Sequence, residues 1–229
     1  MNNIKTLLIA GLLTASHVSS AELKLENIKD QTLAQYVEKN NKSSQWLAYQ
    51  VPAAENTTSM CCWEQDKSSV CDLNELSGGY GSNSQDGLTK NIRVFVNLKR
   101  GQVEQVIPVG DACPVKASGI KVAWLDEVTN KESIDWLKAQ AASAGDENGS
   151  LYTLATHQGK AAATALSDLA KQGGEHANNA VFWLGQRHSD GFSYLKALLS
   201  ELPEGELRKS INFALSQNKQ PEALETLYD

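Results

Sequence analysis

The chain has 229 residues, a hydrophobic share of 41% and a net charge of −6 at pH 7. This acidity argues against a nucleic-acid or anionic-lipid ligand, because both require a basic stripe that displaces counterions. The length is sufficient for one or two hydrophobic cores, and the composition is not that of a disordered chain.

The first 21 residues have the three regions of a secretory signal peptide. Lys5 supplies positive charge, residues 6–13 form an apolar run too short to span a bilayer, and residues 18–21 are small or β-branched. The alternative, a buried N-terminal helix, would lack a polar face and a cap. We predict cleavage between Ala21 and Glu22 and export to the periplasm or the exterior, with no later membrane span and no lipid anchor.

Export determines how the four cysteines are interpreted. An oxidising compartment favours disulfides, and four cysteines permit three pairings. Neighbouring cysteines on an extended segment point to opposite faces, so one of the adjacent pair can reach the nearby cysteine and the other can reach the distant one. A redox motif with two intervening residues and a second pair of zinc ligands are both absent. We predict two structural disulfides among Cys61, Cys62, Cys71 and Cys113.

Residues 22–128 have the pattern of a small, mainly β domain. Residues 46–51 alternate until Pro52, and residues 91–98 and 103–108 form a predicted hairpin that turns at Arg100 and Gly101. A last strand is predicted over residues 120–125 and a helix over 31–37. The glycine- and serine-rich residues 77–87 are predicted to be a mobile surface loop.

Residues 129–229 have a helical pattern. Thr129 and Glu132 form a predicted capping box at the start of the first helix. Short glycine- or proline-containing segments, including Asp190-Gly191, are predicted to separate the helices. The predicted fold class is therefore α+β, with a disulfide-linked β region followed by a short helical array.

A repeat is present inside the helical part. The segments "YTLATHQ", "FWLGQRH" and "FALSQNK" begin at Tyr152, Phe182 and Phe213, which are spaced by 30 and 31 residues. Each segment is followed by an amphipathic stretch, at residues 161–169, 192–199 and 222–227. The spacing is typical of helical solenoids, in which each unit is a pair of helices.

The segments "AVFWLGQRHSDGFSYLKALL" and "SINFALSQNKQPEALETLYD" resemble HEAT repeats, which are stacked antiparallel helix pairs. Of the proline and arginine positions that the family uses, only Pro221 and Arg208 are candidates here. The complete layout is similar to secreted bacterial HEAT-repeat proteins, with Trp46, Tyr49 and Pro52 followed by residues 60–63, "MCCW". This resemblance implies a fold and a binding surface, and it implies no catalytic residue.

The sequence offers no strong catalytic or metal-binding pattern. A nucleophile would need a histidine and a carboxylate beside it, and no Gly-x-Ser-x-Gly elbow, His-Glu-x-x-His motif or phosphate loop is present. His157 and His188 follow the repeat signature, where we expect solvated turn residues, and His176 is expected near a helix start. We expect no cofactor and no metal.

The sequence predicts an exported, non-enzymatic module that binds a protein partner through its helical repeats. Repeated turns follow the signature, and we predict partner contacts at Gln186, Arg187, His188 and Gln217. One alternative is an envelope enzyme or accessory protein with a polar cleft near residues 77–87. A thiol-redox factor is a third possibility.

Overall fold

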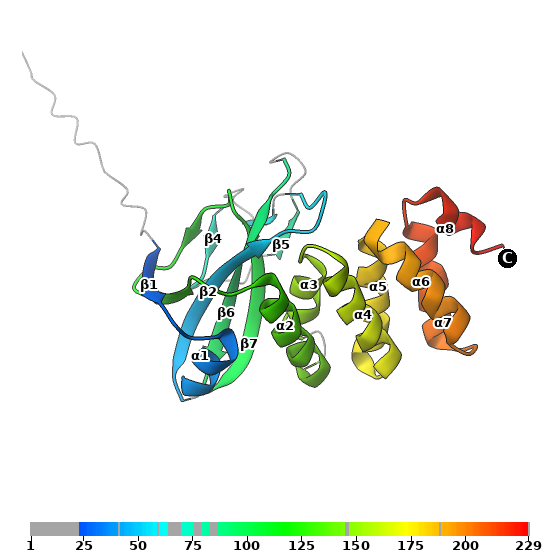
Figure 1. The fold of residues 1–229 in the computed structure, drawn as a ribbon. Coiled ribbons are helices and arrows are strands. Elements are labelled where there is room, and N and C mark those ends of the chain that lie inside the picture. The colour runs from blue at the N-terminus through cyan, green and yellow to red at the C-terminus, as the bar shows by residue number, and fades with distance from the viewer. Residues whose placement is uncertain are drawn as a thin grey trace, which may run out of the picture.

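The computed structural model describes residues 23–228 except 41, 59, 64–69, 76–78, 83–86, 145–146 and 188. The predicted cleavage site therefore lies outside the described residues. A sheet region occupies one end of an elongated molecule, and helices continue from it to the C-terminus (Figure 1). Mixed α and β content and the order of the two regions agree with the predicted class.

The main sheet has five strands in the order β1-β9-β2-β6-β7. The central strands β2, β6 and β7 are antiparallel, whereas β9 pairs in parallel with both β1 and β2. Two small sheets pair β3 with β5 and β4 with β8. The strands are β1 (Lys24–Ile28), β2 (Ser44–Pro52), β3 (Met60–Trp63), β4 (Cys71–Asp72), β5 (Gly79–Ser82), β6 (Asn91–Lys99), β7 (Gln102–Gly110), β8 (Val115–Lys116) and β9 (Lys121–Leu125).

The predicted hairpin is confirmed, because β6 and β7 are joined at Arg100 and Gly101, which both have positive φ values of 52° and 79°. This conformation matches the twist of antiparallel strands, and glycine adopts it at low cost. The prediction for residues 77–87 was partly wrong, because residues 79–82 form β5. Residues 77, 78 and 83–86 lie outside the described residues.

Alternation along the strands buries both faces of the main sheet. Tyr49 and Val94 point toward the helices and belong to a core that continues as far as Ala223 in α8. Trp46 and Phe95 point the other way, into a second core that contains all four cysteines. The sheet thus lies between a helical layer and a disulfide-linked layer, and the larger core continues past the predicted boundary at residue 128.

Both predicted disulfides form, as Cys61–Cys113 and Cys62–Cys71. The first joins β3 to the segment after β7, and the second joins β3 to β4. Adjacent cysteines in β3 therefore serve one distant and one local partner, as predicted.

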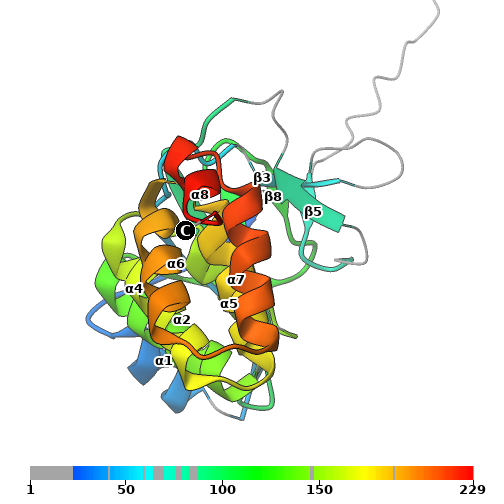
Figure 2. The same ribbon diagram turned by 90° about the vertical axis from the view of Figure 1, so that its right-hand side faces the viewer.

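In the described part of the chain, seven helices follow the sheet and an eighth, α1, comes earlier. The helices α3, α5 and α7 contact one another in succession, and α2, α4 and α6 form a second row (Figures 1 and 2). The helices are α1 (Leu33–Lys39), α2 (Asn130–Ala144), α3 (Ser150–Ala155), α4 (Lys160–Gln172), α5 (Glu175–Gln186), α6 (Ser189–Glu201), α7 (Glu206–Gln217) and α8 (Pro221–Glu225).

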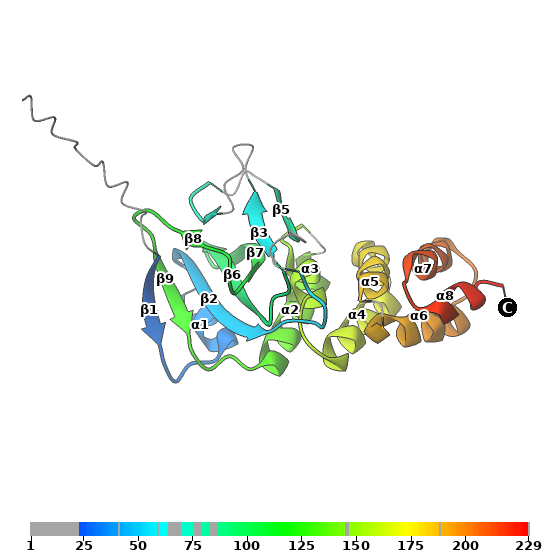
Figure 3. The same cartoon turned by 90° about the horizontal axis from the view of Figure 1, so that it is seen from above.

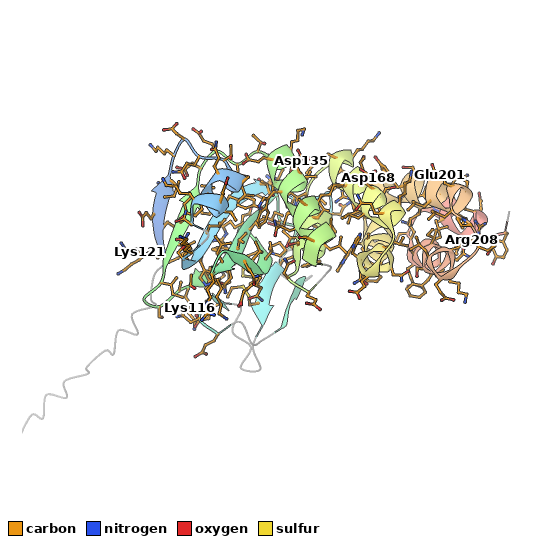
Figure 4. The ribbon with its side chains drawn as sticks, turned by 90° about the horizontal axis from the view of Figure 1, so that it is seen from below. Lys116, Lys121, Asp135, Asp168, Glu201 and Arg208 are labelled. Atoms are coloured by element: carbon orange, nitrogen blue, oxygen red, sulfur yellow. A yellow bond between two sulfur atoms is a disulfide. The ribbon has the colours of Figure 1, made fainter. Side chains whose placement is uncertain are left out.

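Ion pairs join successive helices of the second row. Lys138 of α2 lies 2.6 Å from Asp168 of α4, and Lys171 of α4 lies 2.6 Å from Glu201 of α6. Asp168 and Glu201 lie along one edge of the helices (Figure 4). The 30-residue spacing within each pair follows the sequence repeat, so the repeat organises the contacts between helices.

The predicted capping box at Thr129 forms only in part. The Thr129 hydroxyl accepts a hydrogen bond from the Glu132 N–H at 3.1 Å. The Glu132 carboxylate accepts instead from the backbone N–H of Leu33 at 2.6 Å, at the start of α1. A carboxylate is favourable at a helix N-terminus, so Glu132 stabilises α1 and links it to α2.

Candidate functional site

Two exposed phenylalanines lie at equivalent repeat positions on α5 and α7. Phe182 is 40% exposed and Phe213 is 57% exposed, although large apolar side chains are usually more buried. A hollow of about 260 Å³ lies between them and is also lined by Asn178 and Ser210. We call the exposed side of α5 and α7 the aromatic face; it comprises Asn178, Phe182, Gln186, Ser210, Phe213 and Gln217.

Two of the predicted partner residues belong to this face. Gln186 and Gln217 are exposed and each follows its phenylalanine by one helical turn. His188 lies outside the described residues. The third row member, α3, carries Tyr152 at the equivalent position, where the side chain is partly buried and packs against the core. The aromatic face therefore begins at α5.

Arg187 was predicted to contact a partner, but its side chain is only 3% exposed and is not available for such a contact. Its guanidinium donates hydrogen bonds to the backbone carbonyls of Ala155, His157 and Gly159 at 2.6–3.0 Å and pairs with Asp190 at 3.0 Å. Burial lowers the pKa of Arg187, and the neighbouring Asp190 opposes that change. Arg187 thus joins α5 to the turn between α3 and α4.

A groove beside the aromatic face separates the helices from the segment that follows β2. Its volume is about 350 Å³, and Gln186 lines both this groove and the aromatic face. Tyr152 and Trp183 pack at its base with ring centroids 4.7 Å apart, and burial raises the pKa of Tyr152 to about 12. The β3–β5 pair lies on the same side of the molecule as α5 and α7 (Figure 3). The groove lining is Ala54, Glu55, Asn56, Thr57, Thr58, Met60, Tyr152, Ala155, Thr156, Trp183, Gln186, Arg187, Asp190 and Lys219.

His157 is completely buried, so the prediction of a solvated turn residue was wrong. Its Nε2 lies 2.7 Å from the Ser133 hydroxyl, which lies 2.8 Å from the Tyr49 hydroxyl. Its Nδ1 lies 2.8 Å from the Thr153 carbonyl. Since a carbonyl only accepts, Nδ1 carries the proton and Nε2 accepts from Ser133.

This hydrogen-bonded chain joins the two regions of the molecule. Tyr49 is in β2, Ser133 in α2 and His157 in the turn after α3. Beside it, the Ala54 N–H donates to the Thr156 carbonyl at 2.8 Å and the Gln158 N–H donates to the Pro52 carbonyl at 3.1 Å. Ser133 and His157 resemble two of the three members of a catalytic triad, but both are fully buried, and a substrate could not reach them.

Burial, opposed by the hydrogen bond to Thr153 and reinforced by the charge of Arg187, lowers the pKa of His157 from its ordinary value of 6.5 to about 4. Between those two pH values the unfolded chain binds a proton that the folded chain does not. Stability due to His157 is therefore complete above pH 6.5 and falls as the pH falls.

We expect the free energy of unfolding to drop by about 2 kcal/mol between pH 7 and pH 5 through His157 alone. The measurement is urea unfolding at both pH values for the natural protein and for His157→Gln, which retains an acceptor near Ser133 but does not titrate in this range. The difference between their pH dependences isolates His157. Equal dependences for the two proteins would contradict the assignment.

Residues 77, 78 and 83–86 belong to the segment beside which the alternative interpretation placed a polar cleft, and they lie outside the described residues. Within the described part of the chain, no group of three or more histidine, cysteine or acidic residues is arranged to hold a metal ion. All four cysteines are in disulfides. In the same described ranges, no helix combines the length and the apolar character that a membrane span requires.

Sequence reasoning missed two features of this area. The groove is formed by residues from β2–β3, α3 and α5, which are far apart in the chain. The burial of His157 follows from the backbone hydrogen bonds that join its turn to Pro52 and Ala54. No local sequence pattern predicts those bonds. The aromatic face was detectable, because the repeat signature itself places Phe182 and Phe213 in register.

No family model, no curated protein and no solved structure matches this chain.

Proposed function

We propose that the protein is an exported, non-enzymatic interaction module and that its helical part is a short HEAT-like solenoid that binds a protein partner through the aromatic face. Phe182 and Phe213 are the anchors, Gln186 and Gln217 supply hydrogen bonds beside them, and the groove at Trp183 extends the surface toward the sheet.

The observation that carries this proposal is the exposure of two phenylalanines at equivalent positions of consecutive helix pairs. Aromatic side chains are enriched among residues that dominate binding energy, especially beside pockets that become desolvated. The hollow between the two rings offers such a pocket. Phe182 also packs edge-on against Trp183, with ring centroids 4.9 Å apart, yet both phenylalanine rings remain partly exposed.

The succession of contacts in two rows supports the solenoid interpretation. In a solenoid each repeat touches only its neighbours, so one side stays free along the length of the array. Here α5 and α7 present such a side, whereas α3 is largely buried and the sheet region packs against it through β7. The sheet region would then close one end of the array.

Export is supported by the disulfides. Disulfides form and persist in oxidising compartments and are uncommon in the cytosol. Both bridges are buried in the second core, with each cysteine at most 7% exposed, which is typical of structural rather than exchanging thiols. The thiol-redox alternative has no comparable support.

Site-specific photocrosslinking in the cells that produce the protein tests the proposed face. We expect a photoreactive phenylalanine analogue at position 213 to capture a discrete partner, because that side chain lies on the aromatic face. The same analogue at position 196, an exposed residue of α6 in the other row, should capture none.

The capture at position 213 should also disappear when Phe182→Ser is added, since both rings anchor the same partner. An identical set of products from positions 213 and 196 would contradict the proposal. Unchanged capture after Phe182→Ser would do so as well.

A further inference from the structure

A second hollow, on other elements, combines acidic side chains with two unpaired buried nitrogens. It lies between β7, the end of α2 and the start of α5, and its volume is about 600 Å³. We call it the acidic hollow; the residues that matter are Glu104, Ser143, Glu147, Asn148, Glu175 and His176.

Three carboxylates give this hollow its charge. Glu104, Glu147 and Glu175 come from different segments and are all exposed, and the described residues that line the hollow include no lysine or arginine. Glu104 forms an ion pair with Lys99 at 3.2 Å. The C-terminal end of α2 carries a partial negative charge and the N-terminal end of α5 a partial positive charge, and both ends border the hollow. These two helix-dipole contributions oppose each other, so the carboxylates make the net charge of the hollow negative.

Asn148 provides the second, independent observation. The residue is 5% exposed, its Oδ1 accepts from the Ser150 N–H at 3.0 Å, and its backbone carbonyl accepts from the Val106 N–H at 2.7 Å. These bonds determine the orientation of the amide and leave Nδ2 buried without a partner. The His176 Nε2 is also buried without a partner.

Buried polar groups without partners are uncommon, because each costs about 1–3 kcal/mol. Both nitrogens belong to residues that line the hollow, so a ligand there can accept a hydrogen bond from the Asn148 amide. The ligand must offer an acceptor to the Asn148 amide donor and positive charge to the glutamates. A peptide carbonyl next to a lysine or arginine side chain has both groups.

We propose that the acidic hollow binds a basic peptide segment, with a backbone carbonyl on Asn148 and lysine or arginine side chains on Glu147 and Glu175. The acidic hollow shares no residue with the aromatic face, so this proposal does not depend on the function proposed above.

The test is a titration of the full chain with acetyl-Lys-Gly-Lys-amide, followed by nuclear magnetic resonance and calorimetry. We expect saturable binding, with shifts at the Asn148 side-chain amide and the His176 ring. The double variant Glu147→Gln/Glu175→Gln should bind at least tenfold more weakly. The matched control Glu222→Gln/Glu225→Gln removes the same charge from exposed positions of α8 and should bind within twofold of the natural protein.

Two further arms test the carbonyl contact. Spermidine has the charge but no acceptor and should bind more weakly than the peptide. Asn148→Asp retains the acceptor for Ser150 and adds negative charge, yet it should weaken peptide binding because the donor is lost. The proposal would be overturned if the two double variants lost peptide affinity equally, or if spermidine bound as tightly as the peptide. Tighter peptide binding by Asn148→Asp would also overturn it. Thermal unfolding of each variant checks that the fold is retained.

Discussion

Replacing both Cys61 and Cys113 by serine should lower the free energy of unfolding by about 4 kcal/mol, and replacing Cys62 and Cys71 by about 3 kcal/mol. The bridges differ mainly in the length of chain that they close, because their cysteines are 52 and 9 residues apart in sequence. A longer closed loop removes more conformational freedom from the unfolded chain. Denaturant unfolding of the two double variants measures both values.

The loss should be confined largely to the sheet region. The cysteines pack with Trp46 and Phe95 on the sheet face that points away from the helices. Limited proteolysis of the Cys61→Ser/Cys113→Ser variant should therefore cut before residue 128 first. A larger loss from the short bridge than from the long one would contradict the loop-length argument.

The substitution Gly191→Ala should destabilise the protein by about 3 kcal/mol, at the upper end of the range for overpacking. A Cβ atom at this position would lie 1.7 Å from the carbonyl oxygen of Leu184 and 2.7 Å from its carbonyl carbon. Both are backbone atoms of α5, so relief requires α6 to move away from α5. Thermal or denaturant unfolding measures the change.

Gly205→Ala is the matched control, because no atom lies within 4 Å of a Cβ placed there and the residue has an extended φ of 162°. Its effect should stay below about 1 kcal/mol, the ordinary range for a change at a helix N-cap. If Gly191→Ala were as mild as the control, the close packing of α5 against α6 would be wrong.

Gly191 also shows why a glycine in the sequence can be mistaken for the end of a helix. Asp190-Gly191 was predicted to separate two helices, yet α6 begins at Ser189 and includes both residues. Glycine in that first turn allows two backbones to approach, and a break and a close approach look alike in sequence. Only the position of Leu184 distinguishes them.

The strongly alternating strands and the repeated helices could be predicted because local periodicity determines them. The strands β2, β6, β7 and β9 and the helix pairs after residue 150 lie where the sequence indicated. The exposed edge strand β1 and the short β3, β4, β5 and β8 lack a clear alternation, and they form because the disulfides and neighbouring strands hold them in place. Tertiary contacts of that kind leave little trace in local sequence.

The candidate site shows the same division. The repeat signature predicted Gln186 and Gln217 on an exposed surface, and both are exposed. It also predicted Arg187 on that surface. The guanidinium is buried instead and donates hydrogen bonds to three backbone carbonyls of the turn between α3 and α4. Arg187 follows the exposed Gln186 by one residue and therefore points in a different direction from the helix axis, here toward the interior. A short motif does not determine which direction faces the interior, because that depends on how the helix packs against its neighbours.

The most direct test of the interaction account is the affinity of the photocrosslinked partner for purified natural protein and for the Phe182→Ser/Phe213→Ser variant. We predict that the variant unfolds at the same temperature as the natural protein and binds the partner at least a hundredfold more weakly. The Lys196→Ser variant, altered in the other row, should bind as the natural protein does. Full affinity of the Phe182→Ser/Phe213→Ser variant would contradict the account.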